Sequence, residues 1–223
     1  MESTVDGATV VAAVARVAGR MEELRDDLTR LDAAVGDGDL GITTSKGAAA
    51  LQEYLSANPP GDDLGKFFSR MGMAFNRAAS STMGTLIATA LMRAGKEARG
   101  LASLDGATLA KMLSAADAGV RERGKAKLGD KTIVDALHPA VEAFNEAVER
   151  GQDLDAAAAA MLQAAREGRD AVIPLRSKVG RAAWVGERTE NEPDPGTVLL
   201  VQVLEAILDA EYSQPGSTLN QSQ

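Results

Sequence analysis

Residues 10–28 read VVAAVARVAGRMEELRDDL, with apolar side chains at intervals of three and four positions. Because an α-helix has 3.6 residues per turn, this spacing places them on one helical face. Similar spacing recurs along nearly the whole chain. Aromatic residues, which favour strands, make up only 3% of the sequence, while helix-favouring alanine is abundant. The sequence therefore predicts an all-α protein.

About eight helices are expected in one domain, residues 1–212, packed as an antiparallel bundle or barrel with mostly short connections. The polar segment 213–223 is expected to be a disordered tail. The helices are predicted over residues 10–28, 43 or 44 to 55, 62 or 63 to 78, 83–99, 105 or 108 onward, 131–148, 153–167 and 198–212.

The composition excludes several classes of protein. The 223 residues include 24 basic and 32 acidic ones, a net charge of −8, which argues against nucleic-acid binding. The absence of cysteine excludes disulfides, thiolate zinc sites and cysteine nucleophiles. We find no secretory signal and no apolar run of about 18 residues, so no membrane association and a cytoplasmic location are expected.

The segment 31–41, LDAAVGDGDLG, is the most informative for chemistry. It holds Asp32, Asp37 and Asp39, interleaved with glycines that allow a tight fold. A helix end followed by a solvated acidic turn is one interpretation. In the other, the carboxylates come together and bind a cation, because close carboxylates repel one another without one. Such hard oxygen ligands suit Mg²⁺ or Ca²⁺, and Mg²⁺ often takes its other ligands from substrate phosphates.

Three familiar binding motifs match the sequence in part, but the residues around or within each match argue against it. Residues 36–41 match GxGxxG, but a helical pattern precedes them in place of a strand. An EF-hand loop from Asp37 would need glycine and glutamate where Ile42 and Ala48 stand. Residues 119–125 match GxxxxGK, but alanine follows in place of serine or threonine.

Several motifs together resemble the L subunit of dihydroxyacetone kinases, the DhaL type. Their order and spacing are similar to that family from about residue 10 to residue 212. The motifs are Asp32 with Asp37-Gly38-Asp39, Gly129-Asp130-Lys131-Thr132, Gly180-Arg181-Ala182, Gly186-Glu187-Arg188 and Asp194-Pro195-Gly196.

The resemblance implies a barrel of eight antiparallel helices that binds ADP or ATP at one end through one or two Mg²⁺ ions. It implies Asp32, Asp37 and Asp39 as the metal ligands. Ile133 would line the adenine pocket, and Arg181 would lie beside the nucleotide. The implied nucleotide contacts are Leu40, Gly41, Ile42, Thr43, Ser81, Thr82, Met83, Gly124, Ile133, Arg181, Asp194, Pro195 and Gly196.

The same resemblance implies a kinase that transfers phosphate from ATP, or from ADP recharged by a phosphotransferase protein. The acceptor would be a short ketose, such as dihydroxyacetone or a tetrulose. A histidine of a separate K-type subunit would hold it, so no catalytic residue is expected on this chain. Whether a phosphotransferase subunit and a second copy of the chain are further partners stays open.

A non-catalytic, ADP-binding regulatory or sensor module is the alternative. Two departures from the family pattern motivate it: Leu40 stands where the family has histidine, and Ser80-Ser81-Thr82-Met83-Gly84 replaces a glycine-rich GG(A/T)SG. Elsewhere, the sole histidine, His138, is interpreted as structural. The lone tryptophan, Trp184, is expected to pack beneath a loop.

Overall fold

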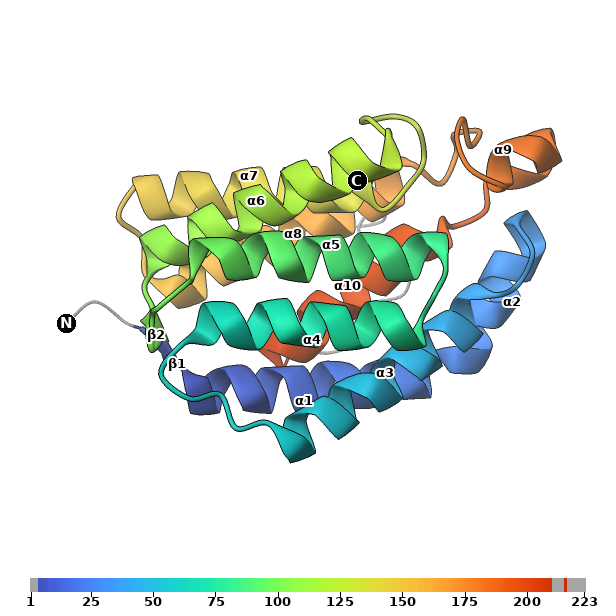
Figure 1. Cartoon of the computed structure of the whole chain (residues 1–223). Coiled ribbons are helices and arrows are strands. Elements are labelled where there is room, and N and C mark those ends of the chain that lie inside the picture. Colours follow the sequence, from blue (N-terminus) through green and yellow to red (C-terminus); the bar gives the residue numbers. More distant parts are fainter. Residues whose placement is uncertain (1–3, 210–214, 216–223) are drawn as a thin grey trace.

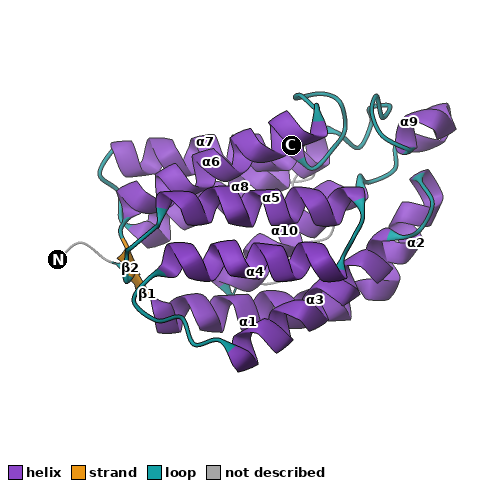
Figure 2. Cartoon of the chain, viewed as in Figure 1, coloured by secondary structure: helices purple, strands orange, loops and turns teal. Residues whose placement is uncertain are grey.

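Ten α-helices make up most of residues 4–209 and 215, the part of the chain that the computed structural model describes (Figure 2). The all-α prediction is confirmed, and none of these helices is long and apolar enough to cross a membrane. Apart from Pro215, the predicted tail 213–223 lies outside the described residues. In chain order the elements are β1 (Val5–Asp6), α1 (Gly7–Glu23), α2 (Arg25–Val35), α3 (Leu40–Ala57), α4 (Leu64–Ala78), α5 (Thr82–Glu97), β2 (Ser103–Leu104), α6 (Gly106–Gly124), α7 (Val134–Glu149), α8 (Leu154–Ala171), α9 (Ala182–Val185), the 3₁₀ helix η1 (Gly186–Thr189) and α10 (Pro195–Leu208).

The helix predicted over 10–28 is two helices in the structure. α1 ends at Glu23, the N–H of the capping residue Leu24 still donates to the carbonyl of Arg20, and α2 begins at Arg25. Met21, Leu24 and Leu28 are all buried, so the predicted apolar face is kept across the break. α2 leaves the direction of α1 and reaches one end of the bundle (Figure 1).

Other boundaries also differ from the prediction. α3 begins at Leu40, before the expected Thr43, because the carboxylate of Asp32 on α2 accepts the N–H of Leu40. α6 continues to Gly124, and α7 starts only at Val134. The short antiparallel pair β1–β2, with Val5 opposite Leu104, was not expected and joins segments far apart in the sequence.

The core consists of two main clusters with α10 between them. Val198 and Leu199 of α10 belong to the cluster formed with α1, α3, α4 and α5. Val201 and Leu204 belong to the cluster formed with α7 and α8. Because α10 is apolar on opposite faces, it is buried along most of its length, and its N-terminus is fixed at one end of the bundle.

That end gathers several chain segments. Figure 1 shows α9 and the starts of α3, α5 and α10 there, close to the C-terminal part of α2. The loop between α6 and α7 lies at the same end, opposite β1 and β2.

Gly65 is expected to be essential for the packing of α4 on α5. A Cβ at this position would lie 2.4 Å from the carbonyl oxygen of Gly95 and 2.5 Å from Cα of Arg99, both backbone atoms. We expect Gly65→Ala to lower the free energy of unfolding by about 1–3 kcal/mol, because the two helices must move apart. Gly19→Ala in α1 is the control, since nothing lies within 4 Å of its added methyl group. Urea unfolding measures both, and equal stability of the two variants would contradict the expectation.

Candidate functional site

Three aspartates come together where α2 ends and α3 begins. Asp32 is on α2, and Asp37 and Asp39 lie in the connecting turn. One carboxylate oxygen of each lies within 4.8 Å of the others, the one such group of three or more acidic or histidine ligands among the described residues. Gly38 has a φ of +76°, and a Cβ at Gly36 would lie 2.7 Å from Oδ1 of Asp32. The glycines therefore allow the tight turn that the sequence predicts.

An arginine from the other end of the sequence meets these carboxylates. Nη1 of Arg181 contacts Oδ2 of Asp37 and lies 3.6 Å from Oδ2 of Asp39. Oδ2 of Asp32 accepts the N–H of Leu40 at 3.1 Å. One guanidinium offsets only one of the three negative charges. The group thus keeps a net negative charge and hard oxygen atoms that suit a divalent cation such as Mg²⁺.

The first turn of α3 adjoins the aspartates. Gly41 packs so closely against α2 that a Cβ would lie 2.0 Å from the carbonyl oxygen of Arg25. Leu40 and Thr43 are buried, whereas the side chain of Ile42 is 45% exposed. The backbone N–H groups at the N-terminus of α3 therefore lie beside the carboxylates. The N-terminus of a helix favours the binding of anions.

The start of α5 lines a cavity of about 460 Å³. Oγ of Ser81 accepts the N–H of Gly84 at 3.0 Å, so Ser81 caps α5. Ser81 and Thr82 are the two predicted contacts in this cavity. Its complete lining is Asn76, Ser80, Ser81, Thr82, Thr85, Leu86 and Arg123.

Three further predicted contacts meet at a separate point. A Cβ at Gly196 would lie 3.1 Å from Cε of Met83 and 3.3 Å from Cβ of Ile133. Gly124, at the end of α6, lies near Leu86, one of the residues that line the cavity. The structure therefore brings the predicted nucleotide contacts to one end of the bundle, but only Ser81 and Thr82 share the cavity.

Asp194 and Pro195 begin α10 at this end. The carboxylate of Asp194 accepts the N–H of Thr197 at 2.8 Å, and Pro195 occupies the first helical turn. Burial raises the pKa of Asp194 to about 7, and the charge of Asp135 adds to the increase. The hydrogen bond from Thr197 and the charge of Lys131 act in the opposite direction.

Sequence reasoning missed part of this region. Asn76, Thr85 and Arg123 line the cavity, but none of them is in a motif that distinguishes it from other helix-surface residues. The expectation for Trp184 was wrong: its side chain is 89% exposed. It belongs to α9, a helix of four residues of which none is buried, so no neighbouring segment among the described residues covers it.

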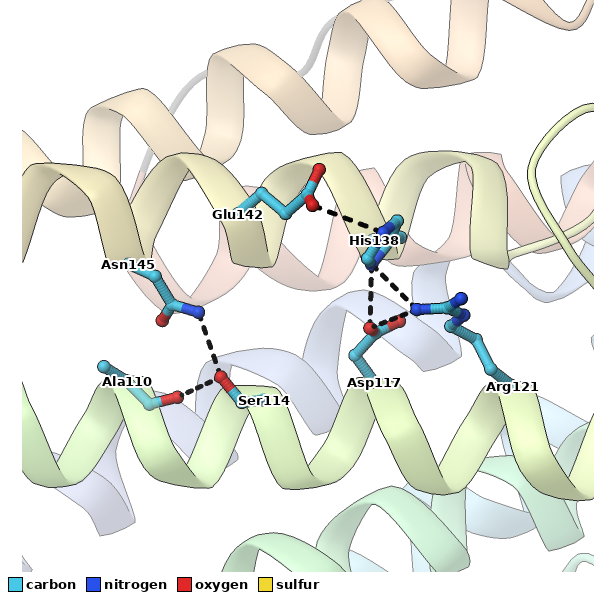
Figure 3. A network of polar contacts seen from close by, with 7 residues as sticks. All are labelled: Ala110, Ser114, Asp117, Arg121, His138, Glu142 and Asn145. Carbon is cyan, nitrogen blue, oxygen red and sulfur yellow. Dashed lines mark hydrogen bonds and ion pairs between the residues drawn. The ribbon is translucent and has the colours of Figure 1, made fainter.

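His138 lies in a different network, between α6 and α7 (Figure 3). Its Nδ1 is 2.8 Å from Oδ2 of Asp117, and its Nε2 is 3.4 Å from Oε1 of Glu142. Arg121 also approaches Oδ2 of Asp117, at 3.5 Å. The side chain of Asp117 is buried, and its Oδ1 has no hydrogen-bond partner among the residues that the structure describes. These contacts agree with a structural role for His138.

We expect His138→Ala to lower the free energy of unfolding by about 1–3 kcal/mol, because it removes a partner from the buried carboxylate of Asp117. Glu142→Ala is the control: Glu142 is exposed, and its removal should cost under about 0.5 kcal/mol. Chemical denaturation gives both values. A His138 variant as stable as the Glu142 variant would contradict the structural role.

Comparison with known proteins relates the chain to one family. A family model described as the DAK2 domain matches residues 34–209. The chain is 33% identical over 193 residues to "PEP-dependent dihydroxyacetone kinase 2, ADP-binding subunit DhaL" of Listeria innocua, covering 85% of this chain and 88% of that one. It is also 33% identical over 193 residues to the L-erythrulose kinase of Pectobacterium atrosepticum, covering 86% of this chain and 33% of that one.

Solved structures show the same fold. The native dihydroxyacetone kinase of C. freundii superposes with a TM-score of 0.71 at 28% identity, over 92% of this chain and 34% of that chain. The same kinase in complex with AMP-PNP and Mg²⁺ superposes with a TM-score of 0.67 at 24% identity, over 95% and 35% of the two chains. This chain therefore spans about a third of those two kinase chains.

Proposed function

The chain belongs to the DAK2 domain family, and from this premise we propose that it is the nucleotide-binding subunit of a magnesium-dependent kinase for a short ketose. One observation carries the proposal: the carboxylate oxygens of Asp32, Asp37 and Asp39 lie within 4.8 Å of one another at an exposed turn. The relatives named as ADP-binding subunits support the choice of nucleotide.

In this proposal, Asp32, Asp37 and Asp39 hold one or two Mg²⁺ ions. When bound, Mg²⁺ supplies neutralisation of phosphate charge and alignment of the transferred group, the main requirements of phosphoryl transfer. The backbone at the start of α3 donates hydrogen bonds to phosphate oxygens. Arg181, already at the carboxylates, adds a positive charge beside the phosphates.

The remaining nucleotide contacts are proposed at the same end of the bundle. Ser81 and Thr82 line the cavity at the start of α5. Met83 and Ile133, which meet at Gly196, offer an apolar surface for the adenine ring. The full proposed set is Leu40, Gly41, Ile42, Thr43, Ser81, Thr82, Met83, Gly124, Ile133, Arg181, Asp194, Pro195 and Gly196.

The acceptor is proposed to be held by a separate K-type subunit, because several relatives are named as subunits. Their description as PEP-dependent favours ADP recharged by a phosphotransferase protein over ATP as the donor. A relative named for L-erythrulose favours a tetrulose beside dihydroxyacetone as the acceptor.

Isothermal titration calorimetry with ADP tests the nucleotide assignment. We expect binding in the presence of Mg²⁺ and loss of binding when EDTA replaces it, because the acidic turn repels a bare polyphosphate. Equal affinity in both buffers would refute the metal assignment.

A reconstituted assay tests the kinase assignment. The chain is combined with a K-type subunit and a ketose, with either ATP or a phosphotransferase protein and phosphoenolpyruvate. Formation of the sugar phosphate supports the proposal, and the productive donor identifies the source of phosphate.

The second candidate is a non-catalytic ADP-binding sensor. It is favoured by Leu40, whose side chain is only 5% exposed and packs into the core, so it offers no polar group where the family has histidine. A protein that binds Mg²⁺ and ADP but yields no sugar phosphate in the reconstituted assay would support this candidate.

A further inference from the structure

Lys131 is a buried lysine near the end of the loop that connects α6 to α7. It is 2% exposed and has a φ of +61°, in the left-handed region. Its Nζ donates to the carbonyl oxygens of Ile173 at 2.9 Å and Leu175 at 2.8 Å, and to that of Thr189. An ammonium group has three hydrogens, so these three bonds use its full donor capacity. Lys131 therefore has no donor left for a phosphate group.

The three acceptors belong to the two ends of one segment, residues 173–189. This segment is part of the connection between α8 and α10. Lys131 thus joins the beginning of this segment to its end. Two bonds add to the closure: the N–H of Ser177 donates to Oγ1 of Thr189 at 3.0 Å, and the N–H of Lys178 donates to the carbonyl of Asp130 at 3.0 Å.

Beyond this closed base, the segment carries α9 and Arg181. Gly180 and Gly186 flank this outer part, with φ values of +68° and +62°, and nothing lies within 4 Å of a Cβ added at Gly180. Arg181 reaches Asp37 from this outer part. The guanidinium is therefore carried by a segment whose two ends Lys131 joins.

Burial lowers the pKa of Lys131, whereas the charge of Asp194 acts to raise it. Holding a charged group inside the protein is costly unless hydrogen bonds and opposite charges compensate. The three carbonyl oxygens supply that compensation, and they would lose their donor if the ammonium were removed.

We propose that Lys131 is a positioning residue that closes the base of residues 173–189 and thereby holds Arg181 over the aspartates, without contacting the ligand. The inference rests on the proposed function for its effect on nucleotide binding. Its effect on the segment itself is independent of that function.

A double-mutant cycle tests the coupling, with Lys131→Met, Arg181→Ala and the double variant titrated with ADP and Mg²⁺. Lys131→Met is expected to weaken binding of ADP with Mg²⁺ about tenfold, because Arg181 would no longer be held in place over the aspartates. In the Arg181→Ala background, the same change should weaken binding less than about twofold. Lys127→Met, an exposed lysine of the same loop, is the control and should bind like the wild type. An equal loss in both backgrounds, or no loss in either, would overturn the proposal.

Fluorescence anisotropy of Trp184, the lone tryptophan, provides a readout that needs no ligand. Trp184 lies in α9, so Lys131→Met should lower its anisotropy, while Lys127→Met should not. Unchanged anisotropy in Lys131→Met would overturn the proposal. If the wild type fails to bind ADP with Mg²⁺, the proposed function fails, and the anisotropy still decides the role of Lys131.

Should Lys131→Met not fold, Thr189→Val takes its place in both measurements. It removes the acceptor of the Ser177 N–H and the donor to the carbonyl of Gly186 at nearly unchanged volume. Because Thr189→Val keeps the carbonyl oxygen that Lys131 binds, a smaller loss of binding and anisotropy in the same direction is expected, and no loss would overturn the proposed closure of residues 173–189.

Discussion

Replacing Asp37 by asparagine is expected to weaken the binding of ADP with Mg²⁺ about 100-fold, or nearly 3 kcal/mol. The reason is the loss of one of three carboxylate charges from a group that Arg181 already partly neutralises. Cation affinity at oxygen sites depends on the number of charged ligands. The fold should be retained, because Asp37 is exposed and its ion pair contributes little to stability.

Titration calorimetry of wild type and Asp37→Asn measures this effect. Asp26→Asn is the matched control, since it removes the same charge from an exposed position at the other end of α2. Its affinity should stay within about twofold of the wild type, because solvent and salt screen the more distant charge. If Asp37→Asn bound as tightly as Asp26→Asn, the aspartates would not hold the metal.

The second large effect is a dependence of stability on pH that comes from Asp194. Burial raises the pKa of Asp194 from 3.8 to about 7. Between these values the folded protein binds a proton that the unfolded chain has already released. The stability contributed by this proton is therefore present below about pH 4 and is lost as the pH rises toward 7. A pKa shift of this size corresponds to a change of at most about 4 kcal/mol in the free energy of unfolding.

Asp194→Asn isolates this contribution. Asparagine also caps helices, so the hydrogen bond to Thr197 can be kept while the titration is removed. Urea unfolding of both proteins from pH 4 to pH 8 should show similar stability at pH 4 and a more stable variant at pH 8. Asp63, whose pKa is lowered to about 2, affects stability only below about pH 4 and cancels in the difference. A constant difference across this range would contradict the raised pKa.

Much of the fold could be predicted because the determining interactions are local. The apolar period indicates which face of each helix is buried. Helix caps act over three residues: Asp105 accepts the N–H of Thr108, and Asp153 that of Ala156. The aspartates could be found for the same reason, since Asp37 and Asp39 share one glycine-containing turn close to Asp32.

By itself, then, the sequence determined the all-α class, the buried faces, the helix starts next to Asp63, Asp105 and Asp153, and the acidic turn. Only the tertiary structure decided that Arg181 meets Asp37, that Lys131 binds the carbonyl of Thr189 58 residues away, and that Trp184 is exposed. Periodicity identifies which side of a helix is buried but not its partner. Contacts between distant segments depend on how the helices pack, and that packing is set by the whole core.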